Sequence, residues 1–273
     1  MRIRPFVFLF ECACFVAGPV SAQLRTAYLN VPPSGVNDTL RIEDFVRREF
    51  PKGVPFREAR RYAVQGSSST LLEMLGRSSE REHWENIVVT LGIIGDPDAI
   101  SPLAAFLQGT PSSQPEDDSS FAARSNVLIA FGCAVNQMSN RHATSPDEVA
   151  NLKKARAEAL GYLVGGRQPS FWVNRIKWSS PYHGTPLERN LHLSNLAIQA
   201  LALTGDREAL SALQSLRDNL KHYRSPANSV PANCRWIQRL APEMIDELSG
   251  ATEEALGIYS KVAASGLAEY YTH

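Results

Sequence analysis

The chain has 273 residues, and its 28 lysine and arginine residues balance its 28 aspartate and glutamate residues, so that its formal net charge is zero. A near-neutral chain has no general electrostatic attraction for nucleic acid, and we therefore expect no nucleic-acid partner. Hydrophobic residues make up 44% of the composition, which is typical of a globular protein. The length is suited to one large domain or to a short array of repeats.

Residues 1–22 have the layout of a secretory signal peptide. Arg2 and Arg4 precede an apolar stretch, and the tripeptide VSA at 20–22 supplies small residues at a cleavage site. We expect an exported bacterial protein, periplasmic or secreted, whose mature chain begins near Gln23. The alternative is an uncleaved membrane anchor, although the apolar stretch is short for a span of about 20 residues. We expect no transmembrane segment in the mature chain.

The mature N-terminus, residues 23–39, is rich in proline, glycine and asparagine and is expected to be extended. Helices should begin near residue 40. Arg57, Arg60 and Arg61 follow in a locally basic stretch and would share one face of a helix. This basic face is either a site for an anion or an acidic partner, or a solvated helix surface.

Residues 90–107, TLGIIGDPDAISPLAAFL, predict two helices separated by an abrupt turn. Apolar residues recur at three- and four-residue spacing on both sides of the turn. Gly95 can end the first helix in the left-handed conformation. Asp96 is a good N-cap for the second helix, and Pro97 suits its first position.

The same pattern returns further along the chain. The segment NLAIQALALTGDREALSALQSL at 195–216 matches the first hairpin at an offset of 110, which places Gly205 on Gly95 and Asp206 on Asp96. A weaker copy of the first helix lies at 126–135, and a degenerate hairpin is expected at 56–77. Related units at a spacing of roughly 30 to 40 residues indicate a helical repeat array.

These hairpins resemble the repeats of HEAT-like proteins, particularly the short bacterial variety named after phycobilisome lyases. The resemblance is good over 80–108 and 188–220 and partial over 56–77 and 119–165. It implies an all-α fold, a right-handed α-solenoid of stacked antiparallel helix pairs over residues 40–220. It also implies a tendency to bind partners, but no catalytic residue, because the matched positions are structural.

The segment at 165–187 is a long loop that interrupts the array. It concentrates aromatic and cationic side chains, which supply much of the binding energy at protein interfaces. A packing plug between irregularly stacked repeats is the alternative interpretation of its tryptophans. The candidate binding residues are Phe171, Trp172, Arg175, Lys177, Trp178, Tyr182 and His183.

Two cysteines, Cys133 and Cys234, remain once the signal peptide is removed. In an oxidising compartment they could form a disulfide. Because Cys133 falls inside an apolar helix, a buried free thiol is the alternative. The spacing of these cysteines and of the scattered histidines does not predict a metal site.

Residues 221–273 depart from the repeat pattern. The segments 232–250 and 251–266 read as two helices, with Thr252 as the N-cap of the second, and are expected to cap the array.

No motif for phosphate binding, metalloprotease chemistry or an activated serine is present in the sequence. We therefore expect a non-catalytic module or scaffold that binds a protein partner and needs no cofactor. Two alternatives remain open: an enzyme or lyase-like protein that handles a chromophore or small molecule beside the 165–187 loop, and a structural subunit of an envelope complex.

Overall fold

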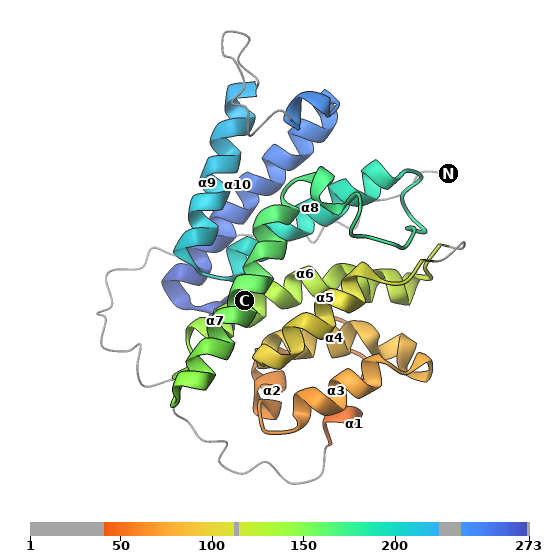
Figure 1. Ribbon diagram of the computed structural model, residues 1–273, viewed down its shortest axis with the longest axis vertical. Coiled ribbons are helices and arrows are strands. Elements are labelled where there is room, and N and C mark those ends of the chain that lie inside the picture. The colour runs from red at the N-terminus through yellow and green to blue at the C-terminus, as the bar shows by residue number, and fades with distance from the viewer. Residues whose placement is uncertain (1–40, 112–114, 224–235, 272–273) are drawn as a thin grey trace. The chain divides into compact units, whose positions relative to one another are not determined.

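A computed structural model describes residues 41–111, 115–223 and 236–271. Within these ranges the chain forms α-helices and short 3-10 turns and contains no strand, so the all-α prediction is confirmed (Figure 1). None of the helices described there is long and apolar enough to cross a membrane. The predicted signal peptide at 1–22 and the segment at 23–39 lie outside the described residues.

The helices stack in two layers. The first layer contains α2 (Phe56–Ala59), α4 (Trp84–Ile94), α6 (Asp118–Ser139), α8 (Pro186–Leu203) and α10 (Pro242–Ser265), each packed against the next. The second layer contains α3 (Ser67–Leu75), α5 (Ile100–Gln108), α7 (Pro146–Gly166) and α9 (Arg207–Tyr223). From α7 onward, each second-layer helix packs against both its own first-layer partner and the next one, and a short α1 (Ile42–Val46) packs against α3 and α4. This is the arrangement of an α-solenoid, in which each unit is stabilised by its neighbours.

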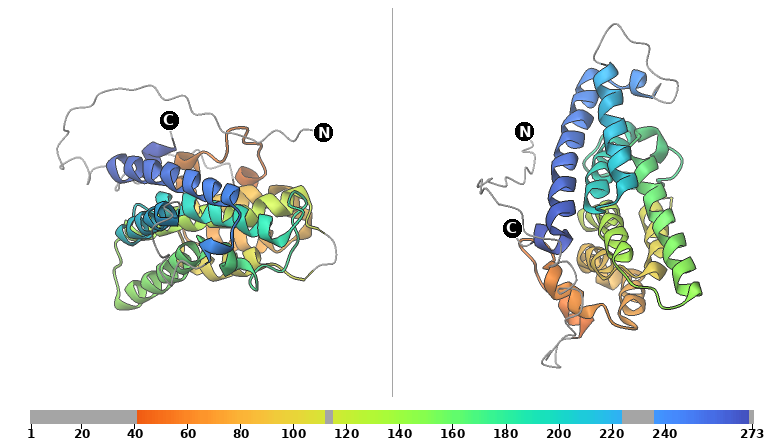
Figure 2. Two further views of the ribbon diagram at one scale, coloured as in Figure 1. Left: turned by 90° about the horizontal axis from the view of Figure 1, so that it is seen from above. Right: turned by 90° about the vertical axis from the view of Figure 1, so that its left-hand side faces the viewer.

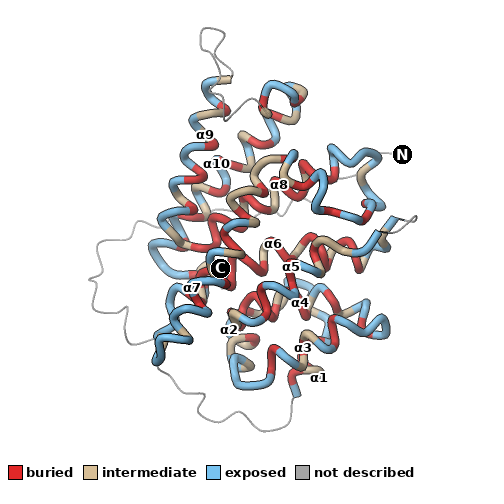
Figure 3. The backbone as a smooth tube through the Cα atoms, viewed as in Figure 1, coloured by how far each residue is buried: buried red, intermediate tan, exposed pale blue. Residues whose placement is uncertain are grey.

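Burial follows the stacking. Figure 3 shows buried residues running along α4, α6 and α8, whereas α7 and α9 expose much of their outer sides. The first-layer helices therefore form the centre of the core, and the second layer covers one side of it.

Both predicted hairpin turns are present. Gly95 and Gly205 adopt left-handed conformations, with φ angles of 70° and 63°. The carboxylate of Asp96 accepts a hydrogen bond from the backbone N–H of Asp98 at 3.1 Å, and that of Asp206 accepts one from Glu208 at 2.8 Å. The second helix of the first hairpin differs slightly from the prediction, because it begins as a 3-10 turn, η4 (Pro97–Ala99), before α5.

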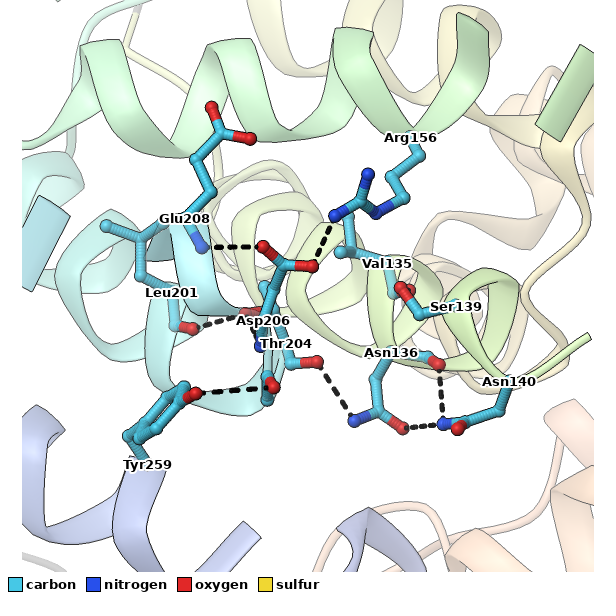
Figure 4. A network of polar contacts seen from close by, with 11 residues as sticks. Val135, Asn136, Ser139, Asn140, Arg156, Leu201, Thr204, Asp206, Glu208 and Tyr259 are labelled. Atoms are coloured by element: carbon cyan, nitrogen blue, oxygen red, sulfur yellow. Dashed lines mark hydrogen bonds and ion pairs between the residues drawn. The ribbon is translucent and has the colours of Figure 1, made fainter. Parts of the chain in front are cut away.

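The carbonyl groups at the end of a first-layer helix are satisfied by the preceding unit. At the end of α4, the Arg60 guanidinium donates to the carbonyl oxygens of Ile93 and Ile94 at 3.2 and 2.9 Å. At the end of α8, the Asn136 side-chain amide donates to the carbonyl oxygen of Thr204 at 3.1 Å (Figure 4). Ile94 and Thr204 are equivalent positions of the two hairpins. Two different side chains therefore meet the same need, since the last carbonyls of a helix have no partner within it.

Asp206 makes an interhelical contact in addition to its capping role, unlike its counterpart Asp96. Besides capping α9, it forms an ion pair with Arg156 of α7 (Figure 4). The side chain of Asp206 is 14% exposed and that of Arg156 is 34% exposed, so this pair is partly shielded from water. Asp206 therefore joins two second-layer helices, whereas Asp96 caps only its own helix.

We expect Asp206→Ala to lower the free energy of unfolding by about 2 kcal/mol, because it removes a cap and leaves Arg156 without its carboxylate. Asp96→Ala, the matched control, should cost about 1 kcal/mol, the usual value of a cap. Urea unfolding followed by circular dichroism measures both. Equal losses in the two variants would mean that the ion pair with Arg156 contributes nothing.

The C-terminal helices differ from the prediction. Instead of two helices divided near Gly250, α10 runs without a break from Pro242 to Ser265 and is followed by the short α11 (Leu267–Tyr270). Thr252 does not act as an N-cap: its hydroxyl donates to the carbonyl oxygen of Leu248 at 2.6 Å, inside the helix. Packing of α10 against both α8 and α9 holds the helix continuous across the glycine.

The last described residues of the chain pack against α2, at the beginning of the array. The ring of Tyr271 stacks on Phe56 of α2, with centroids 5.6 Å apart, and Glu269 forms an ion pair with Arg57 at 3.2 Å. Figure 2 shows α10 running along the array toward α2. Thus α10 covers α8 and α9 at one end of the array, and the residues that follow it contact α2 at the opposite end of the first layer.

Candidate functional site

The 165–187 loop is anchored to the helices around it. At the end of the 3-10 turn η5 (Pro169–Trp172), the indole N–H of Trp172 donates to the carbonyl oxygen of Gly166 at 3.0 Å. The indole N–H of Trp178 donates to the carbonyl oxygen of Leu107 at 2.7 Å. Both tryptophans are fully buried, with 0% of their surface exposed. A buried indole needs a hydrogen-bond partner for its N–H, and both have one.

This burial corrects the binding hypothesis for Trp172 and Trp178. Neither residue can contact a partner in the folded chain. Trp172 is buried against the end of α7, and Trp178 is buried against α5, α6 and α8. Of the other candidate residues, Arg175, Lys177 and Tyr182 are exposed, while Phe171 and His183 are partly buried. The loop therefore has an apolar inner side and a cationic and aromatic outer side.

A cluster of aromatic rings lies where the loop meets the beginning of α6. Phe121 is at its centre, with ring centroids 5.1 Å from Tyr182, 5.9 Å from His183 and 5.5 Å from His192. The two histidine rings are 5.1 Å apart. We call these four residues the histidine–aromatic cluster. The sequence singled out Tyr182 and His183 but not Phe121, which lies in a different segment and carries no local signal of this contact.

Burial gives the two histidines unusual titration behaviour. Desolvation, together with the neighbouring His183, lowers the pKa of His192 to about 4. Desolvation also lowers the pKa of His183. The negative charges of Glu188 and Glu247 act in the opposite direction and raise this pKa, but their effect is smaller. Both rings are therefore neutral near pH 7. No group of three potential metal ligands occurs among the described residues.

The pKa of His192 predicts a loss of stability in acid. The unfolded chain takes up a proton at this residue near pH 6.5, whereas the folded chain does so only near pH 4, so the unfolded state is favoured as the pH falls through this window. We expect the free energy of unfolding to fall by on the order of 2 kcal/mol between pH 7 and pH 4.5 for this reason. Denaturant unfolding at several pH values measures it.

The control for this prediction is a pair of variants. His192→Gln should flatten the acid side of the stability profile, whereas His142→Gln, at an exposed histidine, should leave it unchanged. A profile for His192→Gln that runs parallel to that of the wild type would contradict the assignment.

A groove of about 320 Å³ opens on the outer side of the loop. Its most exposed apolar members are Val173 and Leu187, which are 60% and 41% exposed. The complete lining is Pro169, Ser170, Val173, Leu187, Trp236, Arg239 and Leu240. The sequence predicted a binding loop at this place, but it pointed to the tryptophans rather than to the aliphatic residues that line the groove.

The predicted basic face at Arg57, Arg60 and Arg61 is not formed as a free surface. The helix α2 ends at Ala59, and Arg60 turns inward to donate to the end of α4. Burial lowers the pKa of Arg60. Arg57 pairs with Glu269, so only Arg61 remains exposed with no ion pair among the described residues. After Ala59 the chain continues as the 3-10 turn η2 (Arg60–Tyr62), and the three arginines do not share one open face because Arg60 is bound to the end of α4.

Cys133 is buried in α6, and its sulfur lies 3.7 Å from the hydroxyl oxygen of Tyr271. Desolvation raises the pKa of this thiol to about 12, so it remains protonated at neutral pH. Cys234 lies outside the described residues. The disulfide between the two cysteines therefore stays a prediction.

The comparison with known families identifies the repeat. The profile of the PBS lyase HEAT-like repeat matches residues 85–109, which comprise nearly all of α4, the turn at Gly95, η4 and α5. No curated protein and no solved structure matches the chain significantly. The match lies on the hairpin whose turn and cap were described above, and it includes none of the loop residues.

Proposed function

Because the chain is a HEAT-like repeat protein, we propose that it is an exported, non-catalytic protein-binding module whose contact surface is the groove beside the 165–187 loop. Repeats of this class stack into extended surfaces that suit the binding of partners. The groove is the observation that carries the proposal. Fold alone does not identify a function. The exposed apolar residues in the lining of the groove are what favour the binding of a partner here.

The groove favours a particular kind of partner segment. Val173 and Leu187 offer an apolar contact that is already open to solvent, so covering it gains the free energy of burying apolar surface. Arg239 adds a cation to the lining. A partner segment with an aliphatic or aromatic side chain followed by an acidic residue would complement both features, with the apolar group in the groove and the carboxylate on Arg239.

The proposal is tested by affinity capture from envelope extracts with the mature chain and two double variants. Val173→Ser with Leu187→Ser removes the apolar lining of the groove. Val64→Ser with Val149→Ser is the matched control, because these valines are 57% and 52% exposed and lie elsewhere. A partner retained by the control and lost by the groove variant supports the proposal. A partner that both variants retain would place the contact surface elsewhere.

Two further measurements sharpen this experiment. A photo-crosslinking residue at position 173 should join the captured partner directly, and mass spectrometry of the product should find an apolar residue next to an acidic one at the crosslinked position. N-terminal sequencing of the native protein tests export: a mature chain beginning near Gln23 is expected, and one that begins at Met1 would contradict it.

A further inference from the structure

Arg189 is a buried cation with no carboxylate partner among the residues that the structure describes. The residue is only 7% exposed. Its guanidinium donates to the side-chain oxygen of Asn190, at 3.2 Å from Nε and 2.9 Å from Nη2, and to the carbonyl oxygen of Trp178. These acceptors are neutral. A guanidinium has five N–H donors, so these three hydrogen bonds leave two of its donors free.

Two other arginines, one buried and one partly buried, are compensated. Arg124 forms an ion pair with Glu116 at 3.0 Å, and Arg60 lies at the C-terminus of α4, where the helix dipole is negative. Arg189 lies instead in the first turn of α8, at the positive end of its dipole. Burying a charge without an opposite charge is costly, and the position of Arg189 adds to this cost.

A small polar cavity opens beside this arginine. It has a volume of about 70 Å³, and Arg189 is part of its lining together with Ser179, Ser180, His183, Gly184, Thr185 and Pro186. Hydroxyl groups and the beginning of a helix therefore surround the same space as the guanidinium. None of these residues lines the groove proposed above as the contact surface for a partner.

The acidic residue next to Arg189 does not neutralise it. Glu188 turns its carboxylate to the backbone N–H of Thr185, at 2.9 Å, and completes the capping box of α8. The carboxylate of Glu247 accepts a hydrogen bond from Asn195. Neither of these carboxylates therefore pairs with Arg189, which lines the cavity.

We propose that the cavity lined by Ser179, His183, Thr185 and Arg189 binds a small oxyanion, either a free phosphate or a carboxylate. The oxyanion accepts charge-assisted hydrogen bonds from the free N–H groups of Arg189. The backbone N–H groups of Thr185 and Glu188 are already engaged in the capping box of α8, so the guanidinium of Arg189 is the donor that holds the anion. The size of the cavity limits the bound group to about that of a phosphate.

The test is a titration of the ¹⁵N-labelled mature chain, followed by NMR at constant ionic strength set with sodium chloride. Sodium phosphate is added in one arm and N-acetylglutamate in the other. The expected result is a saturable shift of the Arg189 Nε–H and of the backbone N–H groups of Gly184 and Thr185. The arm with the lower dissociation constant identifies the source of the oxyanion.

Three variants decide whether the site is the one proposed. Arg189→Met removes the charge and should weaken binding at least about tenfold, since a hydrogen bond to a charged group is lost. Ser179→Asp, at an exposed residue of the lining, places a carboxylate in the cavity and should also abolish the shift, even if Arg189→Met does not fold. Arg175→Met is the control, at an exposed arginine of the same loop outside the cavity, and should bind as the wild type does.

The absence of a saturable shift in both arms would overturn the proposal. Unchanged binding in Ser179→Asp would overturn it as well, because the cavity would then not be the site. An equal loss in Arg175→Met would show that the general charge of the loop, rather than Arg189, attracts the anion.

Discussion

Replacing Trp178 with alanine is expected to lower the free energy of unfolding by about 3–5 kcal/mol, the range found for removing a large aromatic side chain from a core. The residue is fully buried, its ring contacts Phe121 edge to face at 5.8 Å, and its indole N–H satisfies the carbonyl oxygen of Leu107. Alanine would leave a cavity and an unsatisfied carbonyl group at the junction of loop and helices. Urea unfolding followed by circular dichroism at 222 nm measures the loss.

Tyr182 provides the matched control, because it is an aromatic residue of the same loop that is 57% exposed. Tyr182→Ala should change the free energy of unfolding by no more than about 0.5–1 kcal/mol, since it removes an edge contact with Phe121 and a solvent-exposed hydrogen bond with Asp118. If Trp178→Ala unfolds at the same urea concentration as the wild type, the tryptophan is not part of the core. The expected loss also means that tryptophan variants are unsuitable for testing partner binding.

The hairpin turns could be predicted because their causes are local. A glycine that ends one helix and an aspartate that caps the next act within a few residues, and both Gly95 with Asp96 and Gly205 with Asp206 behave as predicted. The repetition of this pattern was also enough to predict the all-α solenoid, because stacked neighbours are what hairpins of this kind need to bury their apolar faces.

The failures have a common cause, which is contact between distant segments. Periodicity placed three arginines on one helix face, but the partner of Arg60 is the end of α4, more than thirty residues away. Composition marked Trp172 and Trp178 as aromatic without showing which side of the loop they occupy. The division expected at Gly250 was likewise overridden by the packing of α10 on α8 and α9.

For the candidate sites as well, the sequence predicted the local features and missed those that depend on contacts between distant segments. The sequence located the loop that borders the groove, because a long insertion rich in aromatic residues is unusual in a compact array. It did not identify Val173 and Leu187, whose aliphatic side chains are ordinary until the structure shows them exposed. The sequence did not show that Arg189 is buried without an opposite charge. Only the folded chain shows that no carboxylate among the described residues pairs with it.

Gly132→Ala is expected to lower the free energy of unfolding by about 3 kcal/mol, the upper part of the range for overpacking a core. A Cβ atom at this position would lie 2.4 Å from the carbonyl oxygen of Ala200 and 3.0 Å from its carbonyl carbon. Both are backbone atoms, so no rotamer change can relieve the clash, and α6 and α8 would have to separate. Gly92 has the same relation to Ala130 in the preceding pair of helices, at 2.4 Å from its Cα atom.

These close approaches explain why small residues recur at one position of the first-layer helices, which helix capping does not explain. Positions 92, 132 and 202 are equivalent in the sequence and carry glycine, glycine and alanine, while positions 130 and 200 carry alanine. Small residues on facing helices let the first-layer backbones approach closely, and this spacing sets the stacking distance along the array. A side chain added at position 132 therefore disturbs the contact between α6 and α8, and with it the stacking of neighbouring repeats, as well as α6 itself.

Gly161→Ala separates this effect from the general effect of replacing a helical glycine. Gly161 lies within α7, is exposed, and would place its new Cβ atom in open space. Alanine there should raise the free energy of unfolding by about 0.5–1 kcal/mol, because glycine loses more conformational entropy in a helix. The two substitutions are chemically identical and should have opposite signs. If Gly132→Ala is also stabilising, α6 and α8 do not approach as closely as described, and the account of the repeat as a stack of glycine-spaced helices is wrong.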